Sequence, residues 1–250
     1  MNNPLRNYNY LVVNSLNNSG LIIDPTLAEY YENFLSKNIL QAEAILLTHE
    51  HGDHIAAVSE LKERYQIPVY AHFKYYSSQR VDHVVCDDTV LNFKTSICRV
   101  ITCPGHVADH VSFYFPVDGM LFCGDTIFNG GVGNVKDNSA DVTCLYESIK
   151  KLRFLLNTTK LYPAHDYFEN NLSFARSIDP EDKDYKQWFE KVRQLLPEDR
   201  PVTTLSDENR MNIFFRANEL KLQILLHAKN PNIVDTKTAF YELRARKDVF

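Results

Sequence analysis

The stretch that decides the fold is an apolar run followed by a cluster of metal-binding residue types, Ala44-Ile45-Leu46-Leu47-Thr48 and then His49-Glu50-His51-Gly52-Asp53-His54. The apolar run predicts a buried strand that ends where the cluster begins. In extended backbone, side chains two residues apart point the same way, so His49 and His51 can bind one metal ion. Asp53 and His54 fall where a helical pattern starts, so they can face a second ion. A polar loop that only meets solvent is the alternative, but this spacing favours metal binding.

The composition excludes several classes of protein. The 250 residues are 44% hydrophobic and 24% charged, which is typical of a soluble globular protein of one or two domains. No apolar stretch is long enough to span a bilayer, and Met1-Asn2-Asn3-Pro4 lacks the features of a signal peptide. The net charge of −5 argues against nucleic-acid binding. We expect a cytoplasmic protein, with a monomer as the simplest oligomeric state.

The cysteines also favour a cytoplasmic location. There are five, an odd number, and no two have CxxC spacing. This pattern indicates reduced thiols and predicts neither a disulfide framework nor a zinc knuckle.

Two regions of the chain differ in pattern. The first alternates short apolar runs with helical patterns, beginning with a hairpin from Tyr8–Val13 and Leu21–Ile23. The expected helices are Leu27–Lys37, Ile55–Tyr65 with Asp53 in its N-cap region, and Val142–Leu155; the further strands are Ala44–Thr48, Pro68–His72, Val81–Val85, Ile97–Thr102, Val111–Phe115 and Met120–Cys123. From about residue 169 only charged helical patterns remain. We therefore expect a layered α/β (α+β) domain over residues 1–168 and a smaller helical domain over residues 169–250.

Further candidate ligands come where strands give way to loops. His106 follows Pro104-Gly105, Asp125 follows the strand ending at Cys123, and His165 follows the run Lys160-Leu161-Tyr162. Rigid scaffolds present chemistry at such positions. One such residue alone is weak evidence, but together with the histidine cluster they predict a larger metal site.

At this point the sequence resembles the metallo-β-lactamase-fold hydrolases, and within them the glyoxalase II (hydroxyacylglutathione hydrolase) family. The histidine cluster is common to the superfamily, whereas the C-terminal stretches are specific to glyoxalase II. The stretches that carry the resemblance are Asn7–Val12, Ile23-Asp24-Pro25, Thr48–His54, Pro104-Gly105-His106, Phe122–Thr126, Asn170-Asn171-Leu172, Phe174-Ala175-Arg176, Asn212–Arg216, Leu243-Arg244, Lys247-Asp248 and Phe250.

The resemblance implies an αββα sandwich with two divalent metal ions, zinc first and iron or manganese as alternatives. By similarity, the first ion is held by His49, His51 and His106, the second by Asp53, His54 and His165, and both by Asp125, with Asp53 and Asp125 as the catalytic carboxylates. Two cations lower the pKa of a shared water toward neutrality, so that the water can attack a thioester. The implied reaction is hydrolysis of S-D-lactoylglutathione and other 2-hydroxyacyl-glutathiones, the detoxification of methylglyoxal. No GxSxG nucleophile motif is present.

The same resemblance implies residues that bind the glutathione moiety. Tyr167 matches a tyrosine that contacts glutathione, and Arg244 and Lys247 lie three apart on a helical pattern, where both can face the substrate carboxylates. A solvated face is the default for such a charge pair. The family's basic residue and aromatic after the glycine-rich loop are replaced by Asn134-Val135-Lys136. Lys136 could supply the charge from a shifted position.

Asp24 and four further histidines lie outside the expected ligand set. Asp24 either orients loops near the site or caps the helix that follows, and His110 either supports the ligands or is merely satisfied structurally. We expect His72, His83 and His227 to be surface or packing residues.

Other functions remain open. The chain could instead be a member of the superfamily that hydrolyses another acyl-thioester, ester, lactam or lactone, or a persulfide dioxygenase with a single iron. A metal that only stabilises the fold is disfavoured, since structural zinc sites are closed four-ligand cages.

Overall fold

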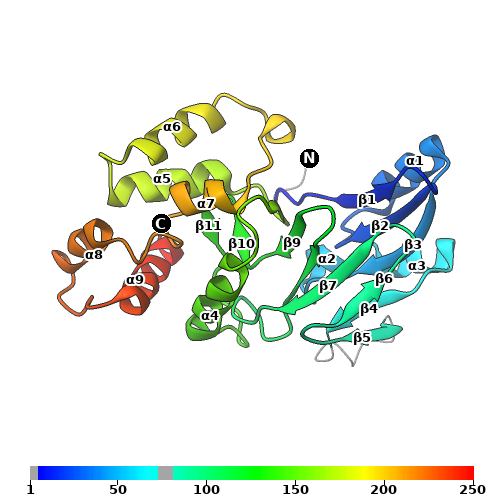
Figure 1. Ribbon diagram of the computed structural model, residues 1–250, viewed down its shortest axis with the longest axis horizontal. Helices are drawn as coiled ribbons and strands as arrows, with labels where there is room; N and C mark the ends of the chain where they lie inside the picture. Colours follow the sequence, from blue (N-terminus) through cyan, green and yellow to red (C-terminus); the bar gives the residue numbers. More distant parts are fainter. Residues whose placement is uncertain (1–4, 73–80) are drawn as a thin grey trace.

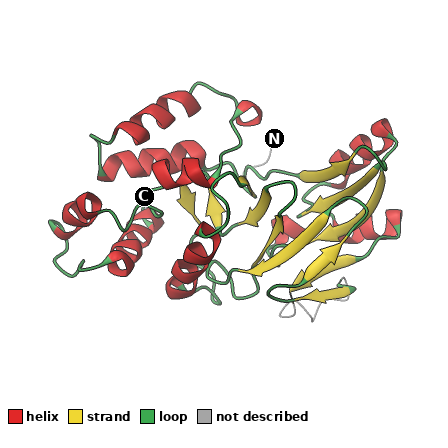
Figure 2. Cartoon of the chain, viewed as in Figure 1, coloured by secondary structure: helices red, strands yellow, loops and turns green. Residues whose placement is uncertain are grey.

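The computed structural model describes residues 5–72 and 81–250 as two packed sheets with helices on both outer faces (Figures 1 and 2). The expected αββα sandwich is confirmed. Residues Met1–Pro4, on which the signal-peptide argument depends, lie outside the described residues.

The first sheet has the strand order β1-β2-β3-β4-β5. Strands β1 and β2 form the antiparallel N-terminal hairpin, and β3, β4 and β5 each pair in parallel with the strand before them. Its strands are β1 (Tyr10–Asn14), β2 (Ser19–Ile23), β3 (Gln41–Leu46), β4 (Val69–His72) and β5 (His83–Val85). The second sheet has the order β12-β9-β8-β7-β6, in which β12 pairs in parallel with β9 and the other pairs are antiparallel. Its strands are β6 (Val90–Asn92), β7 (Ile97–Thr102), β8 (Val111–Phe115), β9 (Met120–Gly124) and β12 (Lys160–Pro163), and a short ribbon of β10 (Ile127–Phe128) and β11 (Gly131–Val132) follows β9.

Alternating side chains divide the interior into three layers. In β2, Ile22 packs under the helices of the first sheet, whereas Leu21 and Ile23 face the second sheet. In β9, Phe122 faces the first sheet, and its neighbour Leu121 faces the opposite way. Since successive strand residues point to opposite faces, continuous apolar runs are what a sheet buried on both sides requires.

Helices cover the two outer faces. Helices α1 (Ala28–Asn38) and α3 (Val58–Tyr65) pack on the first sheet, at the right of Figure 1. On the second sheet lie α4 (Val142–Arg153) and helices of the C-terminal region, which share one hydrophobic core with its strands. The C-terminal helices are α5 (Phe168–Ile178), α6 (Lys183–Val192), α7 (Leu205–Met211), α8 (Leu220–His227) and α9 (Thr236–Asp248).

The strands and helices expected in the first region are confirmed with ends shifted by at most three residues, apart from the helix after the histidine cluster. That helix was expected over Ile55–Tyr65 with Asp53 near its N-cap, which is wrong. A short helix α2 (Gly52–Ile55) begins after His51, and α3 starts only at Val58. Asp53 therefore lies inside a helical turn, and its carboxylate is directed at the histidines instead of capping a helix.

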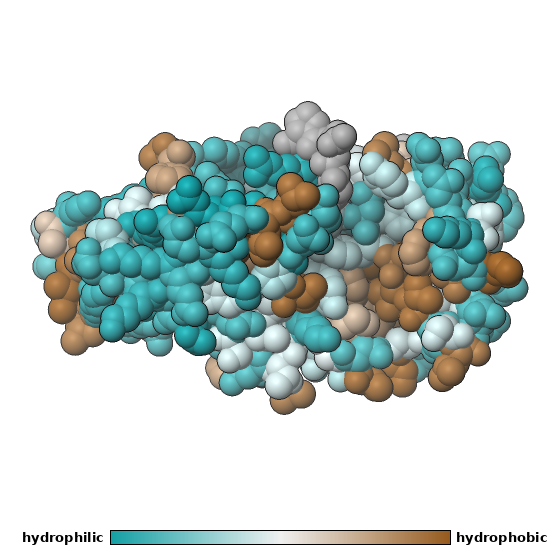
Figure 3. Space-filling view, turned by 90° about the horizontal axis from the view of Figure 1, so that it is seen from above, coloured by the Kyte–Doolittle hydropathy of each residue, from teal (hydrophilic) through white to brown (hydrophobic). Residues whose placement is uncertain are grey.

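The surface differs between the two ends of the molecule. Over α5–α7 it is mainly hydrophilic, and apolar residues gather near β1 and α1 (Figure 3). A groove of about 520 Å³ there is lined by Tyr8, Asn9, Tyr10, Leu11, Tyr30, Tyr31 and Phe34. Among the described residues, no helix combines the length and apolar character needed to cross a bilayer.

A buried carboxylate joins the helical region to the β10–β11 ribbon. Glu208 on α7 accepts hydrogen bonds from the Gly130 N–H (2.9 Å), the Thr203 hydroxyl (2.8 Å) and the Asn212 amide (2.9 Å). Complete burial outweighs these bonds and raises the pKa of Glu208 to about 7. Folded protein therefore retains this proton at pH values where the unfolded chain, with a pKa near 4.5, has released it.

We predict that the contribution of Glu208 to the free energy of unfolding falls as pH rises from about 4.5 to 7, because the folded state binds the extra proton on Glu208 in that window. The contribution of Glu208 is on the order of 3 kcal/mol. Glu208→Gln should remove that part of the fall, whereas Glu190→Gln on the exposed surface of α6 should not. Denaturant titrations across this pH range measure the difference. A Glu208→Gln curve parallel to that of the wild type would contradict the assignment.

Candidate metal centre

The structure brings the seven predicted ligands together at one edge of the sandwich. They come from four separate segments: residues 49–54 after β3, His106 after β7, Asp125 after β9 and His165 after β12. Each segment follows a strand end, as the sequence predicted. The ligands form two groups in which all donor atoms lie within 4.8 Å of one another.

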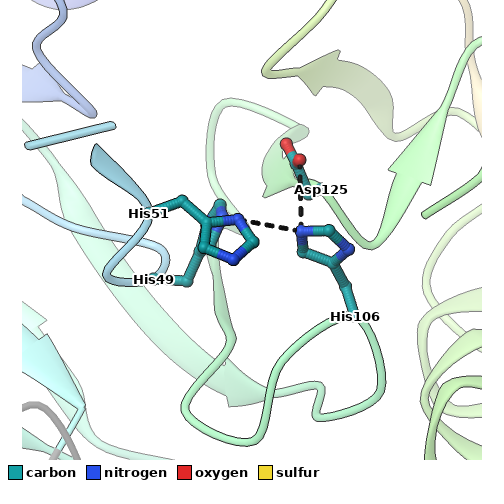
Figure 4. Close-up of side chains that lie close together, drawn as sticks. All are labelled: His49, His51, His106 and Asp125. Atoms are coloured by element: carbon teal, nitrogen blue, oxygen red, sulfur yellow. Dashed lines mark hydrogen bonds and ion pairs between the residues drawn. The ribbon is translucent and has the colours of Figure 1, made fainter. Parts of the chain in front are cut away.

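The first group contains His49, His51, His106 and Asp125 (Figure 4). Nδ1 of His51 lies 3.2 Å from Nε2 of His106, and Oδ2 of Asp125 lies 3.4 Å from the same Nε2. The second group contains Asp53, His54 and His165. Oδ2 of Asp53 is 3.5 Å from Nε2 of His54 and 3.4 Å from Nε2 of His165.

Asp125 lies between the two groups. Its Oδ2 faces His106, and its Oδ1 lies 3.5 Å from Nε2 of His54 and 3.3 Å from Nε2 of His165. One oxygen is thus available to each group, which is the arrangement a bridging carboxylate needs.

The donor atoms fit metal ions in two respects. Three of the donor atoms in the two groups are buried and have no hydrogen-bond partner among the described residues: Nε2 of His49, Nε2 of His54 and Oδ1 of Asp125. Leaving buried polar atoms unpaired is costly unless something binds them. Metal–ligand bonds of about 2.1 Å place the corners of a tetrahedron about 3.4 Å apart, close to the 3.2–3.5 Å between donors here.

The far nitrogens of the histidine rings are held by other groups. Nδ1 of His54 donates to Asp24, Nδ1 of His106 to the carbonyl of Asn134 and Nδ1 of His165 to the carbonyl of Leu5, at 2.8–3.0 Å. Nδ1 of His49 lies 3.0 Å from the Thr48 hydroxyl. Such outer contacts fix the ring orientation and direct the Nε2 of each of these four rings toward the other members of its group.

Asp24 and His110 both support the ligands. Asp24 accepts from the Thr48 backbone N–H and hydroxyl as well as from His54. The helix-capping alternative for Asp24 is wrong, since the residue before α1 is Leu27, with no side-chain cap. His110 accepts the backbone N–H of Asp125 at 3.0 Å and stacks on His49.

The charges of the groups favour cation binding. Burial raises the pKa of Asp125, but His54, His165 and His106 outweigh it and hold that pKa well below its usual value. Burial alone would lower the pKa of His54, yet the surrounding carboxylates, Asp125 first, raise it to about 9. Asp125 is therefore ionised at neutral pH, and metal uptake must displace a proton from His54.

A cavity of about 310 Å³ opens over both groups. Two predicted substrate-binding residues line it, Lys136 and Tyr167, together with Leu5, Asn134 and Asp137. The Tyr167 ring stacks on His165 with 5.1 Å between ring centroids. Burial, with Asp125 and Asp53, raises the pKa of Tyr167 to about 12, so its hydroxyl keeps its proton at neutral pH.

The other two predicted substrate-binding residues lie outside the lining of this cavity. Arg244 is buried, donates to the carbonyls of Val132 and Gly133 and pairs with Asp248. It thereby holds the loop that leads to Asn134. That loop passes Asp125 so closely that a side chain at Gly133 would meet the Asp125 carbonyl oxygen at 2.0 Å.

Lys247 donates to the backbone carbonyl and the side chain of Asn170. Its ammonium also lies over the rings of Phe174 and Phe250. None of these partners is acidic. Burial, then Arg244, lowers the pKa of Lys247 to about 8.

The remaining histidines lie outside both groups, as expected. His72 is buried in β4, His83 stacks on Tyr70, and His227 donates to the carbonyl of Ile233.

Sequence reasoning assigned no role to several residues around the site. Asn7 donates to Asp53 at 2.8 Å, and Oδ2 of Asp137 lies 3.6 Å from Nε2 of His51. Asn7 opens one of the stretches of family resemblance, which was the available signal. The Leu5 and Asn134 carbonyls carry no side-chain signal at all.

The fold and the two ligand groups define the class of protein. Residues 3–89 and 73–198 match the family described as the metallo-beta-lactamase superfamily. A crystal structure of the BLEG-1 B3 metallo-beta-lactamase is similar, with a TM-score of 0.66 and 26% identity, over 85% of this chain and 96% of that chain.

The C-terminal region narrows the class. Residues 166–250 match the family described as "Hydroxyacylglutathione hydrolase C-terminus". A hydroxyacylglutathione hydrolase of Francisella philomiragia is 42% identical over 87% of this chain and 85% of its own length. One of Francisella tularensis subsp. novicida is 40% identical over 100% of this chain and 97% of its own length. The chain belongs to the hydroxyacylglutathione hydrolase family.

We predict that the purified protein binds close to two metal ions and that Asp125→Ala lowers the occupancy of both groups. Asp125 supplies an oxygen to each, so its loss removes one ligand from each ion. Elemental analysis per chain, alongside turnover, measures this. Asp118→Ala, at the exposed turn before β9, is the matched control. If the wild type held a single ion per chain at full activity, and Asp125→Ala kept that activity, the two-ion site would be contradicted.

Proposed function

We propose that this enzyme hydrolyses S-D-lactoylglutathione and related 2-hydroxyacyl-glutathiones to glutathione and a 2-hydroxy acid. The observation that carries the proposal is the bridging position of Asp125 between two complete ligand groups, beneath a cavity with a cation and a tyrosine at its wall. Membership of the hydroxyacylglutathione hydrolase family supports the choice of substrate.

Two divalent ions would supply Lewis acidity, which activates water and polarises the thioester carbonyl. His49, His51 and His106 would hold one, Asp53, His54 and His165 the other, and Asp125 both. We propose zinc as the first candidate. Iron and manganese are alternatives, because histidine and carboxylate donors accept all three metals. Seven ligands are more than a single ion can use, which favours a hydrolase over a single-iron persulfide dioxygenase.

The residues of the chain then bind and orient the thioester. The Tyr167 hydroxyl, which keeps its proton, can donate a hydrogen bond to the substrate beside His165. The Lys136 ammonium can pair with a glutathione carboxylate at the cavity wall. A thiolate is a good leaving group and needs little help from a protonated acid.

We further propose that the chain divides near residue 168, and that residues 169–250 bind the glutathione moiety. Lys247 supports this, because it contacts Asn170, one turn along α5 from Tyr167. Among the residues that the structure describes, this partly buried ammonium has no acidic partner, which suits it to a carboxylate of the substrate. Arg244 would act beside it, although its present bonds also hold the loop at Gly133.

Two finer assignments complete the proposal. Cytoplasmic location is supported by five cysteines that are all free thiols. A monomer is supported by the site itself, because all seven ligands come from one chain.

We predict that Lys247→Ala raises KM for S-D-lactoylglutathione and changes kcat little, because it removes binding shared by substrate and transition state. One charge-assisted contact is worth roughly 1.5–3 kcal/mol, so the increase should be about 10- to 100-fold. Hydrolysis of a short neutral thioester should change little, and Lys237→Ala on the same helix is the matched control.

Arg244→Ala separates binding from support of the fold. It leaves two buried carbonyls without a donor, so we expect lower thermal stability in addition to any rise in KM. If Lys247→Ala slows both substrates equally, this part of α9 supports the structure and does not bind glutathione.

We also predict that Lys136→Ala raises KM for the glutathione thioester by about tenfold, as expected for loss of one exposed charge-assisted contact. Lys94→Ala, in the turn before β7, is the control. An unchanged KM would show that the Asn134-Val135-Lys136 loop does not bind glutathione. A preference for another acyl-thiol, such as a coenzyme A thioester, would then indicate a different carrier.

A further inference from the structure

The N-terminal segment, residues 5–8, lies beside the end of β12. Asn7 forms an antiparallel bridge with His165, and the Tyr8 N–H donates to the carbonyl of Ala164 at 2.8 Å. The segment is thereby fixed against one of the four ligand-bearing segments, at the wall of the cavity that Leu5 helps to form.

The Asn7 side chain contacts a ligand directly. Its Nδ2 donates to Oδ2 of Asp53 at 2.8 Å, and Asn7 is only 2% exposed. The amide thus presents its NH2 group to the carboxylate. The same oxygen of Asp53 is the one that faces His54 and His165. The Asp53 side chain is 22% exposed, so this bond restrains a carboxylate that has access to solvent.

The backbone of the same segment orients a second ligand. The Leu5 carbonyl accepts Nδ1–H of His165 at 2.8 Å, which directs Nε2 at Asp53 and Asp125. Two of the three members of the second group thus depend on residues 5–8. The first group has its outer contacts elsewhere, at Thr48, Asn134 and Asp137.

We propose that Asn7 is a positioning residue for the second metal ion: it holds Asp53 in its ligating orientation and so sets the affinity of this ion separately from that of the first. The inference rests on the proposed two-ion hydrolase. It assigns to the N-terminal segment a part in the metal centre, beyond its place beside the sheet.

The test measures metal release from the full-length zinc-loaded protein to a chromogenic chelator. In Asn7→Leu, which keeps the branched shape of the side chain and removes the donor, one ion should leave at a 10- to 100-fold lower chelator concentration than in the wild type. The chelator concentration that removes the other ion should change by less than about threefold. Asn7→Gln, which keeps an amide donor, should recover part of the affinity. Asn14→Leu, at the far end of β1, is the matched control.

The cobalt-substituted protein gives a second readout. Asn7→Leu should lose absorption from one of two cobalt environments at limiting cobalt, with the unfolding temperature of the metal-free protein measured for comparison. If both ions in Asn7→Leu were released as in the wild type, or both were weakened equally, the proposal would be overturned. A wild type that releases two ions and still fails to cleave the thioester would contradict the proposed function alone. Release of a single ion from the wild type would overturn both.

Discussion

The structure depends on one buried carboxylate that faces two groups of histidines. Asp125 is almost fully buried, yet the rings around it hold it ionised, and its Oδ1 makes no hydrogen bond to a described residue. A charge in such a position needs cations nearby. The strand ends around it supply that environment, because β3, β7, β9 and β12 all deliver their ligands to the same edge of the two sheets.

The support around the ligands extends through the sandwich. Asp24 ties His54 to the start of the histidine cluster, and His110 holds the Asp125 backbone from beneath. On the other side, Glu208 and Arg244 of the C-terminal helices hold the β10–β11 ribbon and the Gly133 loop. The C-terminal region therefore stabilises the loops beside the candidate metal centre. In the proposed function it also offers Lys247 to the substrate, so a change in this region would affect both roles.

The sequence located the candidate ligands better than the residues around them. His49, His51, Asp53 and His54 could be found because two ligand pairs lie in one short segment after an apolar strand. The support from Asn7 could not, since its contact with Asp53 spans 46 residues and that of Leu5 with His165 spans 160. Such contacts follow from chain closure and leave no local pattern. The two-residue strands β10 and β11 are too short to show periodicity. The burial of Arg244 could not be predicted either, because α9 has the charge pattern of a helix on an exposed surface. Its burial results from packing against other parts of the chain.

The most direct test of the account is thiol release from S-D-lactoylglutathione by protein of measured metal content. Protein loaded stepwise with zinc should reach full kcat only as occupancy approaches two ions per chain, and removal of the metal should abolish turnover. Full turnover with one ion, or in metal-free protein, would contradict the two-ion mechanism. No release of glutathione from protein that holds two ions would contradict the proposed substrate.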